Sequence, residues 1–190
     1  RLYAIFSKEA VRTGGLHRFA EDTRGKRGTT EVSSEFLRTI ESWRDGLARE
    51  IALRNPNLAD HELNHAVQAT IDRILFLRIA EDRGIEPADT LHDLADKPDA
   101  YPALCDLFRR ADERYNAGLF NFGPQGDQVC LNLQINDKPL HDILKGLYYP
   151  VCPYEFSVIP GDILGAVYEQ FLGKVIRLTA GHRAKVEDKP

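Results

Sequence analysis

Residues 61–65 read H-E-L-N-H, which is the spacing that zinc hydrolases use on a helix. Histidines four residues apart share one helix face, so His61 and His65 could both bind Zn²⁺, with Glu62 as general base for a bound water. A catalytic zinc needs a third protein ligand, and no other histidine lies in a recognisable ligand motif. The motif also falls in the first turn of its helix, where polar side chains are expected to cap. We therefore interpret both histidines as surface residues and keep a zinc-dependent hydrolase as the alternative.

Other fragments of catalytic motifs are incomplete. Pro98-Asp99 and Glu187-Asp188-Lys189 together spell a P-D…E-x-K nuclease signature, but they are far apart and neither follows a strand pattern. The glycine-containing segment 122–126 lacks the preceding strand and following helix of a cofactor loop. The three cysteines lack C-x-x-C spacing, which indicates free thiols rather than a zinc or redox pair. We therefore predict no catalytic residues and no cofactor site within these 190 residues.

Basic residues gather at two places in a chain whose net charge of −4 gives no overall attraction to nucleic acid. One group lies in a glycine-punctuated loop from Thr23 to Thr30, and the other lies in the C-terminal tail. Such clusters can contact DNA phosphates. Neither cluster has an arrangement of residues that reads base edges, so any contact should not depend on base sequence. The predicted phosphate-contacting residues are Arg24, Lys26, Arg27, Arg177, Arg183 and Lys185.

The strongest helical pattern runs from Leu58 to Gly84 and organises the prediction for the rest of the chain. We expect Asn57 to cap its start and Gly84 to end it in a left-handed turn. Apolar residues occupy nearly its whole circumference, which predicts a buried central helix. Its internal charges, Asp72, Arg73 and Arg78, then need partners inside the fold.

A second long helix should precede this one, capped by Ser33 or Ser34 and ended by Asn55-Pro56, so that the two form an antiparallel pair. Shorter helices are predicted at 2–11, 91–94, 104–118, 137–147 and 161–174. The alternation from Val129 to Ile135 predicts an isolated extended arm, and the polar tail from Thr179 should be extended. The predicted fold is all-α: an irregular multi-helix domain with one short extended arm and an extended C-terminal tail.

Three regions follow from this pattern: an N-terminal helical segment and basic loop at 1–31, a helical core at 32–148, and a lead-in to a further domain at 149–190. The chain holds no methionine and starts in a helical pattern, so we expect it to be part of a longer polypeptide. No stretch of eighteen apolar residues and no signal-peptide pattern is present, which predicts a cytoplasmic protein without membrane contact.

Residues 71–84, I-D-R-I-L-F-L-R-I-A-E-D-R-G, resemble a segment of the single-chain Type IIG restriction-modification enzymes. Those enzymes fuse an endonuclease to an adenine-specific DNA methyltransferase. The resemblance continues in order through 115–120 (Y-N-A-G-L-F), 147–150 (L-Y-Y-P), 153–157 (P-Y-E-F-S) and 163–173, and so covers almost the whole chain.

The resemblance implies a helical connector between the nuclease and methyltransferase domains. It implies that the parent enzyme binds DNA and uses S-adenosylmethionine and Mg²⁺, and that this segment is inactive alone. The chain lacks the cofactor motif, and Cys152-Pro153-Tyr154 retains only one proline of the Asn-Pro-Pro-Tyr motif. A helical protein-interaction module is a further alternative.

The first prediction concerns zinc. Because we interpret His61 and His65 as surface residues, the purified chain should hold no stoichiometric zinc by elemental analysis. A tightly bound zinc that is lost on His65→Ala substitution would instead favour the hydrolase.

Overall fold

The computed structural model describes residues 28–115, 118–152, 156, 157, 159, 165 and 169–189, with side chains from residue 34 onward. Its elements are α4 (Gly28–Arg54), α5 (Asp60–Asp82), η1 (His92–Leu94), α6 (Ala100–Tyr115), α7 (Gln128–Leu131), α8 (Asp137–Lys145), β1 (Lys174–Leu178) and β2 (Ala184–Asp188). The predicted helix at 2–11, residues Arg24, Lys26 and Arg27, and most of 153–168 lie outside the described residues.

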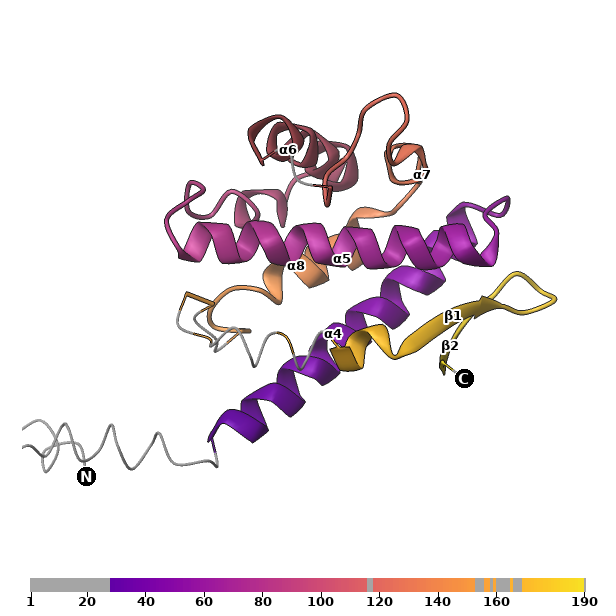
Figure 1. The fold of residues 1–190 in the computed structure, drawn as a ribbon, viewed down its shortest axis with the longest axis horizontal. Helices are drawn as coiled ribbons and strands as arrows, with labels where there is room; N and C mark the ends of the chain where they lie inside the picture. Colours follow the sequence, from indigo (N-terminus) through magenta and orange to yellow (C-terminus); the bar gives the residue numbers. More distant parts are fainter. Residues whose placement is uncertain are drawn as a thin grey trace, which may run out of the picture.

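Helix α5 lies at the centre of the fold, as predicted. In Figure 1, α6 and α7 lie on one side of it, and α4 and the β1–β2 hairpin lie on the other. Ile71 and Ile74 are each 1% exposed. Leu75 and Ile79, which the apolar pattern also places in the core, are only partly buried. The helix is therefore covered along most of its circumference but not all of it.

The start of α5 differs from the prediction, whereas its end agrees. Asn57 is not the cap, because Leu58 N–H donates to the Asn55 carbonyl and places Asn57 in a turn. The cap is Ala59, whose N–H donates to the Glu62 carboxylate at 2.8 Å. At the other end, Gly84 has a φ of 67°, the left-handed conformation that glycine adopts without strain.

Helix α4 begins earlier than predicted. Gly28, Thr29 and Thr30 are helical, so Ser33 and Ser34 lie inside the helix and are not its cap. No proline interrupts residues 28–54, so nothing in the sequence stops the helix from extending towards its N-terminus. The helix ends at Arg54, where the sequence predicted it, and packs against α5.

The predicted extended arm at Val129–Ile135 is wrong for its first residues, because Gln128–Leu131 is a short helix, while 133–136 have no regular secondary structure. Asp127 accepts from Cys130 N–H at 3.0 Å and caps a helical turn, α7, that buries Cys130. An isolated extended segment has no strand to satisfy its backbone groups, whereas a capped turn satisfies them locally. The helices predicted around α6 and α8 are present.

The predicted tail is extended over Ala184–Asp188, but it is paired rather than isolated, because β1 and β2 form an antiparallel hairpin that the sequence analysis did not predict. Ile176 is 2% exposed and lies opposite Val186, so this face packs on the helices. Arg177 and Lys185 lie opposite each other on the outer face. Over the residues that the structure describes, the fold is therefore mostly helical with one small two-stranded sheet. No helix in the described part of the chain is long and apolar enough to cross a membrane.

The second prediction concerns the core. Ile74→Ala should lower the free energy of unfolding by about 2 to 5 kcal/mol, through lost burial and the cavity left behind. Urea unfolding followed by Trp43 fluorescence measures this loss. Leu53→Ala is the matched control, because Leu53 is 71% exposed and should change stability little. A nearly neutral Ile74→Ala would contradict the central position of α5.

Candidate nucleic-acid contact surface

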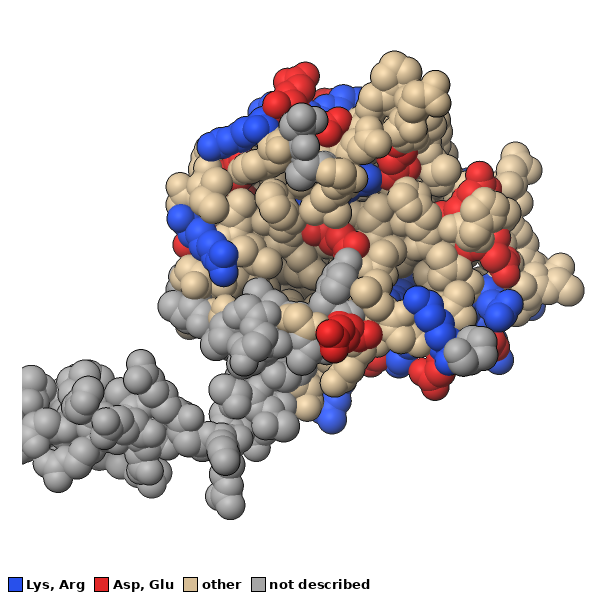
Figure 2. Space-filling view, viewed as in Figure 1, with Lys and Arg blue, Asp and Glu red and all other residues tan. Residues whose placement is uncertain are grey.

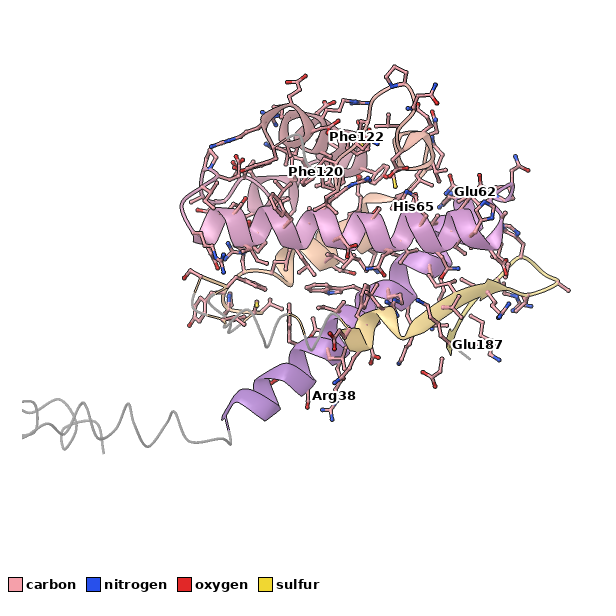
Figure 3. The ribbon with its side chains drawn as sticks, viewed as in Figure 1. Arg38, Glu62, His65, Phe120, Phe122 and Glu187 are labelled. Atoms are coloured by element: carbon pink, nitrogen blue, oxygen red, sulfur yellow. The ribbon has the colours of Figure 1, made fainter. Side chains whose placement is uncertain are left out.

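The H-E-x-x-H side chains do not assemble around one metal position. Glu62 is engaged with the backbone of Ala59, and His65 points to the loop before α7 (Figure 3), where its Nε2 lies 3.0 Å from Asp127 Oδ2. His61 is exposed. Among the described residues, the side chains that converge are His65, Asp127 and Cys130, with possible ligand atoms within 4.8 Å of one another.

The buried side chain of Arg73 contacts this group of three residues through Asp127. Arg73 Nη2 lies 2.7 Å from Asp127 Oδ2, and its guanidinium lies 4.5 Å from the centre of the Phe122 ring. Burial would raise the pKa of Asp127, but the Cys130 N–H and the Arg73 charge together lower that pKa to about 2. Burial raises the pKa of the Cys130 thiol, which opposes the thiolate form needed for nucleophilic attack or metal binding. The geometry therefore does not favour a zinc hydrolase.

The same arginine attaches α5 to the loop after α6. Arg73 Nε donates to the Leu119 carbonyl at 2.8 Å. Beside it, Phe120 is fully buried and packs edge-on against Phe76 at 5.3 Å between ring centres. In the sequence, residues 71–84 and 115–120 were separate landmarks of the family resemblance. In the structure, described residues from both meet around Arg73.

A second buried arginine, Arg78, joins α5 to a further landmark, residues 147–150. Its Nε donates to the Leu147 carbonyl at 3.1 Å, its Nη1 pairs with Asp82, and its guanidinium lies 4.2 Å from the Tyr148 ring centre. Tyr148 donates its hydroxyl to Glu81, which also accepts from Leu91 N–H. Burial raises the pKa of Glu81.

Asp82 extends this cluster to the last landmark but one, because it accepts from the Phe156 N–H at 2.8 Å. Farther along the chain, Phe171 is held in the same way by Arg44, which donates to its carbonyl and lies 3.5 Å from its ring centre. The side chains described in the family-like segments thus serve mainly to hold distant parts of the chain together.

The hairpin is fixed to the first turns of α5. Asn64 accepts from Ile176 N–H at 2.7 Å and also donates to the Ile176 carbonyl. Asp60 accepts from Leu178 N–H at 3.1 Å. These side chains pair with the free edge of β1 much as a neighbouring strand would. Asn64, one of the unspecified positions of the H-E-x-x-H pattern, therefore has a structural task of its own.

Three of the predicted phosphate-contacting residues come together on this hairpin. Arg177 and Lys185 are exposed and lie opposite each other, and Arg183 is exposed in the connecting turn. Glu187 lies on the same outer face, 3.5 Å from Arg177 Nε and 2.9 Å from Lys185 Nζ. On the hairpin side, Figure 2 shows Lys and Arg side chains grouped together with acidic ones nearby.

Sequence reasoning missed the attachment residues. Asn64 was considered only as part of the zinc motif, and no contact with a distant segment was predicted for Asp60 or Asp127. The short stretches I-R-L at 176–178 and A-K-V-E at 184–187 gave a usable strand signal, because apolar and charged residues alternate in each of them on either side of a turn.

Comparison with known proteins gives one informative relative. The chain is 32% identical over 185 residues to the Type II restriction enzyme and methyltransferase RM.Eco57I of Escherichia coli. The chain is homologous to part of a bifunctional restriction-modification enzyme. The alignment covers 97% of this chain but only 18% of that relative. No protein-family model and no solved structure matches the chain. That relative is named as both a restriction enzyme and a methyltransferase, the two activities that the sequence resemblance joins in one chain.

The third prediction concerns pH. The pKa of Asp127 is lower in the folded chain, about 2, than the roughly 3.9 of an unfolded aspartate, so its ionisation stabilises the fold above the unfolded value. The contribution is roughly 2 to 3 kcal/mol at neutral pH and falls as the pH drops through 4 towards 2. The stability difference between wild type and Asp127→Asn should therefore be smaller near pH 3 than at neutral pH.

Urea unfolding at both pH values measures this difference. Asp106→Asn is the control, since Asp106 forms an exposed ion pair with Arg109 that contributes little to stability at either pH. A difference for Asp127→Asn that stays constant between the two pH values would contradict the role assigned to this carboxylate.

Proposed function

We propose that this chain is the helical connector of a restriction-modification enzyme, which holds an endonuclease domain and an adenine-specific DNA methyltransferase domain at a fixed spacing. The observation that supports the proposal is a set of three buried arginines that bond to distant segments: Arg73 and Arg78 from α5, and Arg44 from α4. A connector that sets a distance must resist bending, and buried ion pairs with several hydrogen bonds each fix the packing of its parts.

The proposed parent enzyme uses S-adenosylmethionine and Mg²⁺ in its catalytic domains and acts in the cytoplasm. The segment at 1–31 would lead from one domain, 32–148 would form the connector core, and 149–190 would lead towards the methyltransferase. The homologous relative is named as both a restriction enzyme and a methyltransferase, and the chain corresponds to less than a fifth of it, which supports flanking domains of this kind.

We further propose that the outer face of the β1–β2 hairpin contacts the DNA backbone. Arg177, Lys185 and Arg183 supply cationic groups that are exposed and lie on a firmly attached element. Phosphate contacts of this kind fix position without reading sequence. Since the whole chain is acidic, binding should sit at the weak end of the non-specific range, about 10⁻⁴ to 10⁻⁶ M at physiological salt.

The fourth prediction concerns this contact. Binding of a short fluorescein-labelled DNA duplex, followed by anisotropy, should weaken steeply between about 50 and about 200 mM salt and should not depend on base sequence. Arg177→Ala with Lys185→Ala should reduce the affinity several-fold and flatten the salt dependence, because two phosphate contacts are lost. Alanine at Arg24, Lys26 and Arg27 tests the predicted loop in the same assay.

The matched control removes two exposed arginines, Arg109 and Arg110, from α6, which lies across α5 from the hairpin in Figure 1. This variant has the same net charge as the hairpin variant. If both lose affinity equally, the binding reflects overall charge and the hairpin contact is wrong. Tight, sequence-selective binding that survives high salt would replace the connector by a domain that reads bases itself.

A further inference from the structure

Glu187 bridges both cations of the hairpin's outer face. Its Oε1 lies 2.9 Å from Lys185 Nζ, two residues along the same strand, and its Oε2 lies 3.5 Å from Arg177 Nε on the neighbouring strand. Each carboxylate oxygen thus faces one cation. Figure 3 labels Glu187 on β2, away from α5. This face lies on the solvent side of the hairpin, so the bridge is open to competing anions.

Arg177 and Lys185 are directly opposite each other in the strand register. Like charges in that position repel, and a carboxylate that contacts both reduces the repulsion. Interaction with Lys185, and then with Arg177, lowers the pKa of Glu187, so the carboxylate is ionised whenever the hairpin would meet DNA. A DNA phosphate carries the same charge and bonds to the same donors.

We propose that Glu187 is an internal competitor for DNA phosphate, which limits how strongly the hairpin binds the backbone. This inference rests on the proposed contact between the hairpin and DNA. For a phosphate to be bound by both cations, the carboxylate must give up both contacts. The affinity of the connector for DNA would thereby stay low, and selection of the DNA site would be left to other parts of the enzyme.

Removing the carboxylate should therefore strengthen DNA binding. Exposed ion pairs are individually weak, so releasing two of them corresponds to a gain of about 3- to 10-fold in affinity at low salt. The salt dependence should also become steeper, since two more cations are free to replace counterions on the duplex. An effect of net charge alone would give a smaller gain and would be the same for any nearby acidic residue.

Asp188 supplies the matched control. It is the next residue on β2, it is exposed, and it lies opposite Lys174, whose ammonium pairs with Glu41 instead. Asp188→Asn changes the net charge by the same amount as Glu187→Gln without removing the bridge. Glu187→Thr, which retains a residue that favours strands, is a second variant without the carboxylate.

The experiment measures binding of the fluorescein-labelled duplex to the 190-residue chain at about 50 and about 200 mM KCl. Amide exchange at Ile176, whose N–H is bonded to Asn64, reports whether the hairpin stays docked in each variant. Glu187→Gln and Glu187→Thr should both bind more tightly and with a steeper salt dependence, and Asp188→Asn should change little. This gain should disappear when Arg177 and Lys185 are alanine.

The outcomes separate the two proposals. If alanine at Arg177 and Lys185 weakens binding but neither Glu187 variant strengthens it with Ile176 still protected, the competition is wrong and the DNA contact stands. If Asp188→Asn gains as much as Glu187→Gln, the effect is net charge and the competition is again wrong. If alanine at both cations leaves binding unchanged, the contact itself is wrong.

Discussion

Three buried arginines impose the constraint on which the fold depends. Arg44, Arg73 and Arg78 are 3%, 2% and 9% exposed, and a guanidinium cannot lose its proton to escape the cost of burial. Each must therefore find acceptors inside the protein. Each bonds to the main-chain carbonyl of a residue far along the chain: Arg44 to Phe171, Arg73 to Leu119 and Arg78 to Leu147. Because these acceptors belong to irregular segments or to helix ends, the arginines position chain that has little regular structure of its own.

Aromatic rings complete each arginine site. Arg44 lies over Phe171, Arg73 over Phe122 and Arg78 over Tyr148. A guanidinium is planar and less strongly hydrated than an ammonium, so it can stack on a ring and still donate in its own plane. Lysine could not replace it without losing one of the two contacts. The residue types of the family-like segments thus follow from packing requirements around the charge, and they need no catalytic explanation.

The sequence predicted the elements whose signals are local and missed those that depend on a distant partner. The position of α5 follows from apolar periodicity over more than twenty residues, and its need for partners follows from Arg73 and Arg78 within it. The partners were not predictable, because the Leu119 and Leu147 carbonyls carry no side-chain signal. The hairpin was missed because its alternating pattern spans only a few residues in each strand, and because it is held by Asp60 and Asn64, more than one hundred residues earlier.

The candidate site shows the same division. Sequence reasoning grouped Arg177, Arg183 and Lys185 by proximity in the chain, but it could not place Arg177 opposite Lys185 or give Glu187 its position between them. The H-E-x-x-H pattern failed in the opposite way, since its spacing is real but Glu62 caps the helix and Asn64 binds the hairpin. The first turn of a helix has backbone N–H groups without partners in the helix, so polar side chains there are often used for capping rather than for catalysis.

The attachment of the hairpin has a mechanical consequence. Asn64 and Asp60 join β1 to the start of α5, while Arg73 and Arg78 join the later turns of the same helix to the loops around α6 and α8. A force on the hairpin is therefore carried along one continuous, hydrogen-bonded helix to both arginines. The hairpin's outer cations are held by the same helix that organises the core, so any phosphate they contact is fixed in position relative to the whole segment.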